Sequence, residues 1–168
     1  VDPVPGMSDE TKKLYKAEAT VLKAFYYNLL WKFWGNIPYY DVNLTAPYIT
    51  PQLPADEVYN KIVTKLEEVI DAGVLPMKAQ GGQEGRVTLA MTYMLYAEAV
   101  MYQNDESRYA KALGYMEEII NSGNYSLVAD YASICYLTIS YFVLLRDFLF
   151  GRQLRSRTVL SAIWERAT

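Results

Sequence analysis

The sequence predicts an all-α fold of four helices in two hairpins, of the tetratricopeptide-like kind that stacks into a right-handed α-α superhelix. Three observations lead to this prediction. Apolar residues recur at three- and four-residue spacing in four segments, Gly or Asn stands where each segment ends, and about four residues join the last two. A connection that short makes two helices antiparallel. Because a helix pair cannot bury its own apolar face, such pairs stack.

The first helix is predicted from Ser8, a good N-cap followed by two acidic residues, to Trp34. Gly35 ends it and Pro38 prevents its return. From residue 22 onward the helix is apolar nearly all round, which predicts burial on several sides. Within that half, Trp31 and Phe33 are interpreted chiefly as core residues. The predicted inward face consists of Leu14, Ala17, Val21, Ala24, Phe25, Asn28 and Leu29.

Residues 36–54 contain four Pro and no helical period, so they predict a long loop. A loop of this length in a compact domain is usually functional or disordered, and its aromatic content argues against disorder. The second helix is predicted to start near Pro54 and to end at Gly73. Its narrow apolar stripe consists of Val58, Ile62, Leu66, Val69 and Ile70.

The third helix is predicted from about Thr88 to Gln103, and the fourth from about Arg108 to Asn121 with Gly123 as its stop. The third helix should face inward with Leu89, Tyr93, Tyr96, Ala97, Val100 and Met101. The fourth should do so with Ala112, Leu113, Met116, Ile119 and Ile120.

Composition excludes several functions. The chain has no His and a single Cys, so a Ser-His-Asp or Cys-His catalytic system and a zinc site built from His or paired Cys are excluded. A net charge of −3 disfavours sequence-independent nucleic-acid binding. Paired carboxylates such as Glu67 and Glu68 could suggest glycoside hydrolysis. Adjacent residues on a helix point about 100° apart, however, so these two cannot act on the same glycosidic bond. We therefore expect neither an enzyme, a cofactor nor a nucleic-acid partner.

Charge and composition divide the chain into residues 1–133 and residues 134–168. The first part has 11 basic and 17 acidic residues, and the second has five basic and two acidic residues, all five being Arg. A dense apolar run that contains Cys135 opens the second part, and an Arg- and Ser-rich stretch closes it. Such a change in charge and composition predicts either a segment with a different function or translation in another reading frame. We hypothesise a frame change, which a clean gene sequence would refute.

Several short segments, in matching order and spacing, resemble the SusD/RagB family of outer-membrane nutrient-binding lipoproteins. They are AEA at 17–19, FYYNL at 25–29, FWGNIP at 33–38, DEVYNKI at 56–62, GRVT at 85–88, LYAEA at 95–99, YAKA at 109–112 and IINSGNYSL at 119–127. The resemblance covers about residues 10–133. Family members are several times longer, so the resemblance implies a fragment of a larger SusD-like fold. It ends where the charge reverses.

The resemblance implies a non-catalytic protein on the surface of the outer membrane of Bacteroidetes-type bacteria, active in polysaccharide utilisation. Such proteins capture oligosaccharide or another nutrient and deliver it to a SusC-like TonB-dependent transporter. Membrane association would come only from a lipid-bearing Cys upstream of Val1, so Cys135 is not that residue. No stretch is apolar enough to predict a transmembrane helix. The start of the chain also lacks a signal-peptide pattern.

The candidate ligand-binding residues lie at the end of the first helix and in the long loop. Sugar C–H faces pack on aromatic rings, and the Tyr hydroxyl and Trp N–H can reach polar groups. For the loop residues Tyr39, Tyr40 and Tyr48, the sequence supports a role in packing and a role in ligand contact equally well. A second interpretation is a generic helical-repeat scaffold for protein–protein interaction. The candidate residues are Trp34, Asn36, Tyr39, Tyr40 and Tyr48.

Overall fold

A computed structural model describes residues 4–43, 45–47 and 49–127, and this part of the chain forms four α-helices with very little sheet. The all-α prediction is confirmed. The predicted boundary at residue 133, the tail 134–168 and Cys135 lie outside the described residues. The elements are α1 (Asp9–Trp34), β1 (Ile37–Pro38), β2 (Gln52–Leu53), α2 (Ala55–Ala72), α3 (Leu89–Gln103), the 3₁₀ turn η1 (Glu106–Arg108) and α4 (Tyr109–Asn121).

Local capping chemistry fixes the helix ends close to where the sequence predicts them. The Ser8 hydroxyl accepts a hydrogen bond from the backbone N–H of Thr11 at 3.2 Å, and the Thr88 hydroxyl accepts one from Met91 at 3.2 Å. Gly35, with φ of +67°, ends α1 and donates its N–H to Trp31 O at 2.8 Å. Positive φ strains residues that carry a Cβ, so Gly is favoured at this stop.

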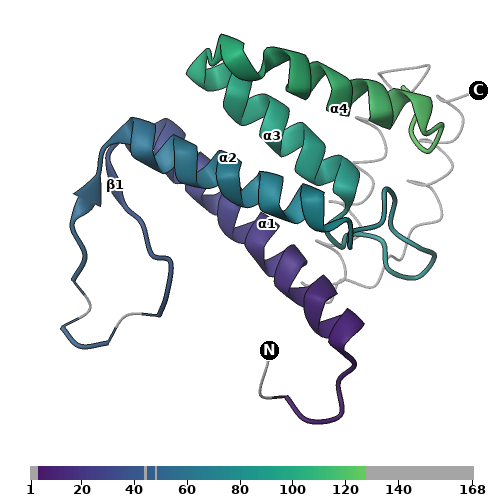
Figure 1. Cartoon of the computed structure of the whole chain (residues 1–168), viewed down its shortest axis with the longest axis horizontal. Helices are drawn as coiled ribbons and strands as arrows, with labels where there is room; N and C mark the ends of the chain where they lie inside the picture. The colour runs from purple at the N-terminus through teal and green to yellow at the C-terminus, as the bar shows by residue number, and fades with distance from the viewer. Residues whose placement is uncertain (1–3, 44, 48, 128–168) are drawn as a thin grey trace, which may run out of the picture. The chain divides into compact units, whose positions relative to one another are not determined.

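Each helix packs against the next along the chain, so that α1 contacts α2, α2 contacts α3 and α3 contacts α4. Figure 1 shows α2 running back along α1, and α4 running back along α3. The central position of α3 explains why it buries residues on more than one face, because both α2 and α4 cover it. The fully buried centre of the core consists of Val21, Val58, Ile62, Val63, Leu66, Tyr96, Ala99 and Val100.

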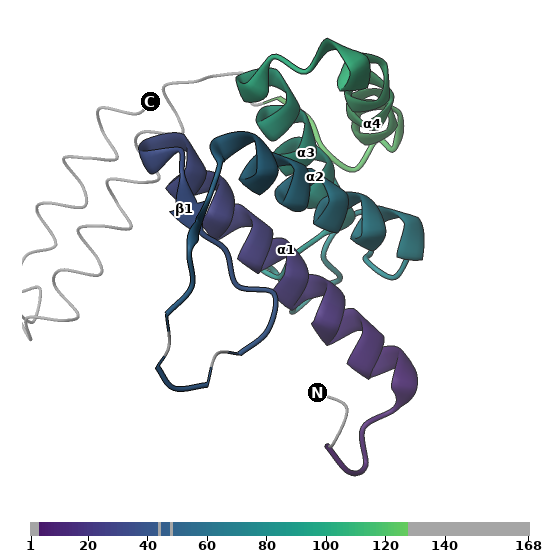
Figure 2. The same ribbon diagram turned by 60° about the vertical axis from the view of Figure 1, so that its left-hand side comes forward.

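The loop between α1 and α2 is closed at its base by β1 and β2, a pair that the sequence did not predict. The two strands are antiparallel, with Ile37 opposite Leu53 and Pro38 opposite Gln52. The side-chain carbonyl of Asn36 accepts a hydrogen bond from the Ala55 N–H at 2.9 Å, which ties the end of α1 to the start of α2. Figure 2 shows the loop extending from this base, away from the helices.

The predicted inward faces are only partly correct for the described residues: Ala17, Val21, Ala24 and Asn28 on α1 and Ala112 on α4 are buried, but other predicted residues are exposed. Several apolar residues in the second half of α1 are exposed, and Phe33 is 76% exposed although it was predicted to be core. On α4, Leu113 and Ile120 are 61% and 73% exposed, and Met101 on α3 is 62% exposed. The reason is geometric: hydrophobicity alone does not say which side of a helix will meet a neighbouring helix.

Polar side chains connect the hairpins where they meet. The Tyr59 hydroxyl on α2 donates to Asp105 Oδ2 at 2.9 Å, and the Tyr96 hydroxyl on α3 donates to Glu67 Oε1 at 2.8 Å. Asp105 also accepts hydrogen bonds from Ser107 and Arg108. These three donors, Ser107 foremost, lower the pKa of Asp105 from 3.8 to about 2.

Asp105 should therefore make stability depend on pH in a defined acidic window. Since folding depresses its pKa, its stabilising contribution is complete above about pH 4 and is lost as pH falls towards 2. We expect Asp105→Asn to be less stable than the wild type at neutral pH, with a difference that shrinks below about pH 4. Urea unfolding followed by circular dichroism across this range measures it. The exposed Asp71→Asn is the control, and a difference that stays constant with pH would contradict the prediction.

Candidate functional site

Tyr39, directly after β1, lies between α1 and α2 and is only 7% exposed. Its ring packs on that of Tyr27 with centroids 4.2 Å apart. The ammonium groups of Lys23 and Lys61 lie 4.8 and 5.3 Å from its centroid, which is within cation–π range. Burial, followed by the nearby Asp41 carboxylate, raises the pKa of the Tyr39 hydroxyl to about 12. The Tyr39 ring is therefore engaged by the protein itself.

The next two residues present polar groups beside this ring. The Tyr40 backbone N–H donates to the Tyr27 hydroxyl at 3.0 Å, and the Tyr40 side chain is 36% exposed. Asp41 accepts a hydrogen bond from Lys61 at 2.8 Å and forms an ion pair with Lys23 at 3.9 Å. The hydrogen bond from Lys61 is the main reason that the pKa of Asp41 is lowered.

The other candidate residues lie in different surroundings. Trp34 is 66% exposed at the end of α1, and its ring contacts that of Phe33 at 5.6 Å between centroids. Asn36 is exposed, but its side-chain oxygen is used at the start of α2. Tyr48 lies outside the described residues. The structure thus brings Tyr39 and Tyr40 together and leaves a largely open ring at Trp34.

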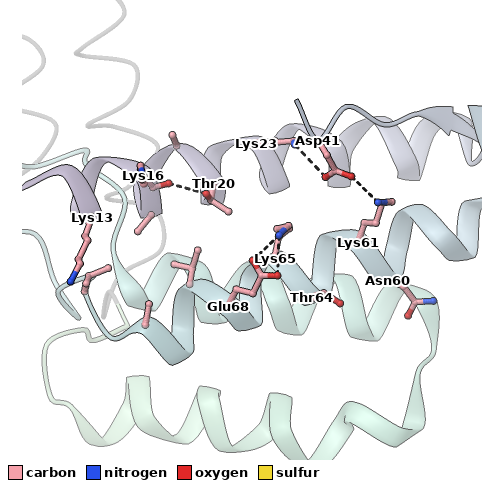
Figure 3. Close-up of a pocket in the computed structure, with 15 residues that line it drawn as sticks. Lys13, Lys16, Thr20, Lys23, Asp41, Asn60, Lys61, Thr64, Lys65 and Glu68 are labelled. Carbon is pink, nitrogen blue, oxygen red and sulfur yellow. Dashed lines mark hydrogen bonds and ion pairs between the residues drawn. The ribbon is translucent and has the colours of Figure 1, made fainter. Parts of the chain in front are cut away.

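A groove of about 1080 Å³ runs between α1 and α2. Its lining includes Lys23, Asp41 and Lys61, the charged residues that surround the Tyr39 ring. Figure 3 shows lysines from both helices along it, with Asp41 paired to Lys23 and Lys61 at one end and Lys13 at the other. Most of its lining is basic, small or hydroxylated. The lining residues are Lys13, Lys16, Ala17, Ala19, Thr20, Lys23, Asp41, Asn60, Lys61, Thr64, Lys65, Glu68, Val69, Ala72 and Val74.

The sequence analysis missed this groove, although a signal for it exists. On α1, Lys13, Lys16, Thr20 and Lys23 follow a three-four-three spacing, which places them on one helix face. On α2 the lysines at 61 and 65 are four residues apart and share a face for the same reason. Two basic stripes on helices predicted to be antiparallel neighbours would have indicated a shared basic surface.

The described residues give no sign of a metal or membrane-spanning site. Within them, no group of three or more Cys, Asp or Glu side chains is placed to hold a metal ion. No helix among them is both long and apolar enough to cross a bilayer.

The fold is similar to that of solved bacterial surface proteins. Surface glycan-binding protein A from Bacteroides uniformis is 50% identical, with a TM-score of 0.76 over 79% of this chain and 30% of that one. Surface glycan-binding protein A from Bacteroides thetaiotaomicron, solved in complex with laminarihexaose, is 54% identical, with a TM-score of 0.72 over 79% of this chain and 27% of that one. A laminarin-binding SusD-like protein is 27% identical, with a TM-score of 0.61 over 67% of this chain and 24% of that one.

The fold and these similarities define the class and the family of the chain. The stacked helical hairpins define a tetratricopeptide-like helical protein. The identities of 50% and 54% to surface glycan-binding proteins, together with the similarity to SusD-like proteins, show that the chain belongs to the SusD-like family, as the sequence motifs predicted. The chain spans less than a third of the length of each of these structures. No family model matches the chain, and no curated protein is significantly similar to it.

Proposed function

We propose that the chain is the helical part of a cell-surface protein that captures oligosaccharide without catalysis and delivers it to a SusC-like TonB-dependent transporter in the outer membrane. The observation that carries the proposal is the 54% identity to a surface glycan-binding protein solved with laminarihexaose bound. Two further points support it: the chain has no His for the common catalytic triads, and its helices form a rigid stack that can hold a binding loop in place.

Laminari-oligosaccharides are the first ligand class to test. Two similar structures favour them, since one protein was solved in complex with laminarihexaose and another is a laminarin-binding SusD-like protein. Among the described candidate residues, Trp34 and Tyr40 have ring surface open to a ligand. Tyr39 would support the loop next to Tyr40 and would not contact the ligand itself, because its ring is packed on Tyr27. A role for Tyr48 in ligand binding stays a prediction, because Tyr48 lies outside the described residues.

Trp34→Ala should weaken binding of laminarihexaose. A stacking ring contributes about 0.5–1.5 kcal/mol beyond its buried area, so we expect the dissociation constant to rise roughly two- to tenfold. Isothermal titration with laminarihexaose, supported by retardation in a laminarin-containing gel, measures the effect.

Tyr26→Ala is the matched control because Tyr26 is an aromatic residue of the same helix and is 61% exposed. It should bind like the wild type. Equal weakening in both variants would show that Trp34 has no special role. If the wild-type chain failed to bind while a full-length parent bound, the glycan contacts would lie outside these helices.

Delivery to a transporter needs its own test. When the full-length parent is extracted from outer membranes with mild detergent, a TonB-dependent transporter should purify with it. A parent that binds glycan but purifies alone would support capture and contradict delivery.

One observation favours the second interpretation, a protein-interaction scaffold. None of the residues that line the α1–α2 groove is aromatic, although sugar sites rely on aromatic rings. Instead, lysines dominate the lining, which suits an anionic partner.

A further inference from the structure

The α1–α2 groove concentrates positive charge in a chain that is otherwise acidic. Five lysines and two carboxylates line it, whereas the whole chain carries −3. Asp41 is shared between Lys23 and Lys61, and Glu68 forms an ion pair with Lys65 at 2.7 Å. The lining therefore contains three more basic than acidic side chains, and all of its lysines come from two facing helices.

The lysines at one end of the groove lie close enough to repel one another. The pKa of the Lys23 ammonium is lowered, first by burial and also by the charges of Lys65 and Lys61, even though Asp41 raises it. A bound anion near these side chains would reduce that repulsion. Local excess charge of this kind also speeds association with an oppositely charged partner.

The shape of the groove suits an extended chain better than a compact ion. Lys13 and Lys23, the ends of the α1 stripe, are ten positions apart, which is about 15 Å at the helical rise of 1.5 Å per residue. An extended peptide spans that length with about four to five residues. Between the lysines, the lining provides Thr20, Thr64 and Asn60, whose hydroxyl and amide groups can hydrogen-bond to peptide groups.

We propose that the α1–α2 groove binds an acidic peptide segment of a protein partner, extended along the two helices with its carboxylates beside the lysines. The absence of aromatic rings from the lining favours a peptide over an acidic oligosaccharide. This inference rests on the scaffold interpretation and not on glycan binding. The proposed peptide site does not include Trp34, which does not line the groove.

The test uses the full 168-residue chain and a fluorescein-labelled hexaglutamate peptide, with hexaglutamine as the uncharged comparison. Fluorescence anisotropy should show binding of hexaglutamate that weakens as salt is added, and much weaker binding of hexaglutamine. The double variant Lys13→Gln, Lys65→Gln removes two of the five groove lysines without touching Lys23 or Asp41. We expect it to bind hexaglutamate about five- to tenfold more weakly.

Lys12→Gln is the matched control, because Lys12 is the residue before Lys13 on α1 but does not line the groove. It should retain wild-type affinity, and all variants should show the wild-type circular dichroism spectrum. The proposal is overturned if the double variant binds as well as Lys12→Gln, or if hexaglutamine binds as tightly as hexaglutamate. It is also overturned if a hexagalacturonate oligosaccharide binds more tightly than hexaglutamate and the double variant loses that binding, because the groove would then be a site for acidic sugar. Laminarihexaose plays no part in these measurements, so their failure is distinguishable from failure of glycan capture.

Discussion

Trp31→Ala should lower the free energy of unfolding by about 3–5 kcal/mol, the usual cost of removing a large buried aromatic side chain. Trp31 is only 4% exposed. Its ring lies between Tyr59 of α2 and Tyr102 of α3, with centroids 5.6 and 5.1 Å away. Because this one side chain contacts both neighbouring helices, its loss leaves a cavity where α1, α2 and α3 meet. For a domain of this size, such a loss is a large share of total stability.

Trp34→Ala is the matched control for that measurement. Trp34 lies three residues further along α1 but is 66% exposed, so its removal should change the free energy of unfolding by less than about 0.5 kcal/mol. Urea unfolding followed by circular dichroism at 222 nm is the suitable measurement, since both variants lose a tryptophan and their fluorescence is not comparable. Equal destabilisation would mean that the end of α1 is covered in solution, contrary to the structure.

Leu66→Ala should cost about 2–5 kcal/mol, because Leu66 on α2 is completely buried at the centre of the core. Leu113→Ala removes the same atoms from α4, where Leu113 is 61% exposed. Since Ala has at least the helix propensity of Leu, this second variant should be nearly neutral. Thermal unfolding of the two variants, side by side with the wild type, gives the comparison.

The Leu113 result also bears on the predicted faces. The sequence analysis placed Leu113 inward, and the structure places it outward. A Leu113→Ala variant as unstable as Leu66→Ala would show that some part of the chain covers this face of α4.

Helix ends were predictable because their causes are local. Ser8 and Thr88 accept backbone hydrogen bonds from residues three positions away, and Gly35 and Gly73 take up positive φ within the turn that they close. The predicted boundaries consequently differ from the observed ones by about one residue. The family assignment followed for a similar reason, since short motifs in a fixed order are visible in the sequence itself.

Burial and pairing were less predictable because they depend on distant residues. The strands β1 and β2 have only two residues each, too few for any alternation to be recognised, and one contains Pro38. Phe33 and Ile120 are apolar, but the sequence does not say which neighbour, if any, lies against them. Tyr39 is the converse case: its buried ring depends on Tyr27 and on lysines from two helices, which only the folded hairpin brings together.

The short β1–β2 pair has a consequence for how this protein can vary. By pairing residues 37–38 with 52–53, it fixes the two ends of the intervening loop independently of what lies between them. The entropy of closing a loop rises slowly with length, by about 0.6 kcal/mol for each doubling. Insertions, deletions or replacement within residues 42–50 should therefore leave the crossing of α1 and α2 intact. The loop sequence can therefore change, in evolution or by engineering, without changing the packing of the helices. Such changes could alter which ligand the loop binds.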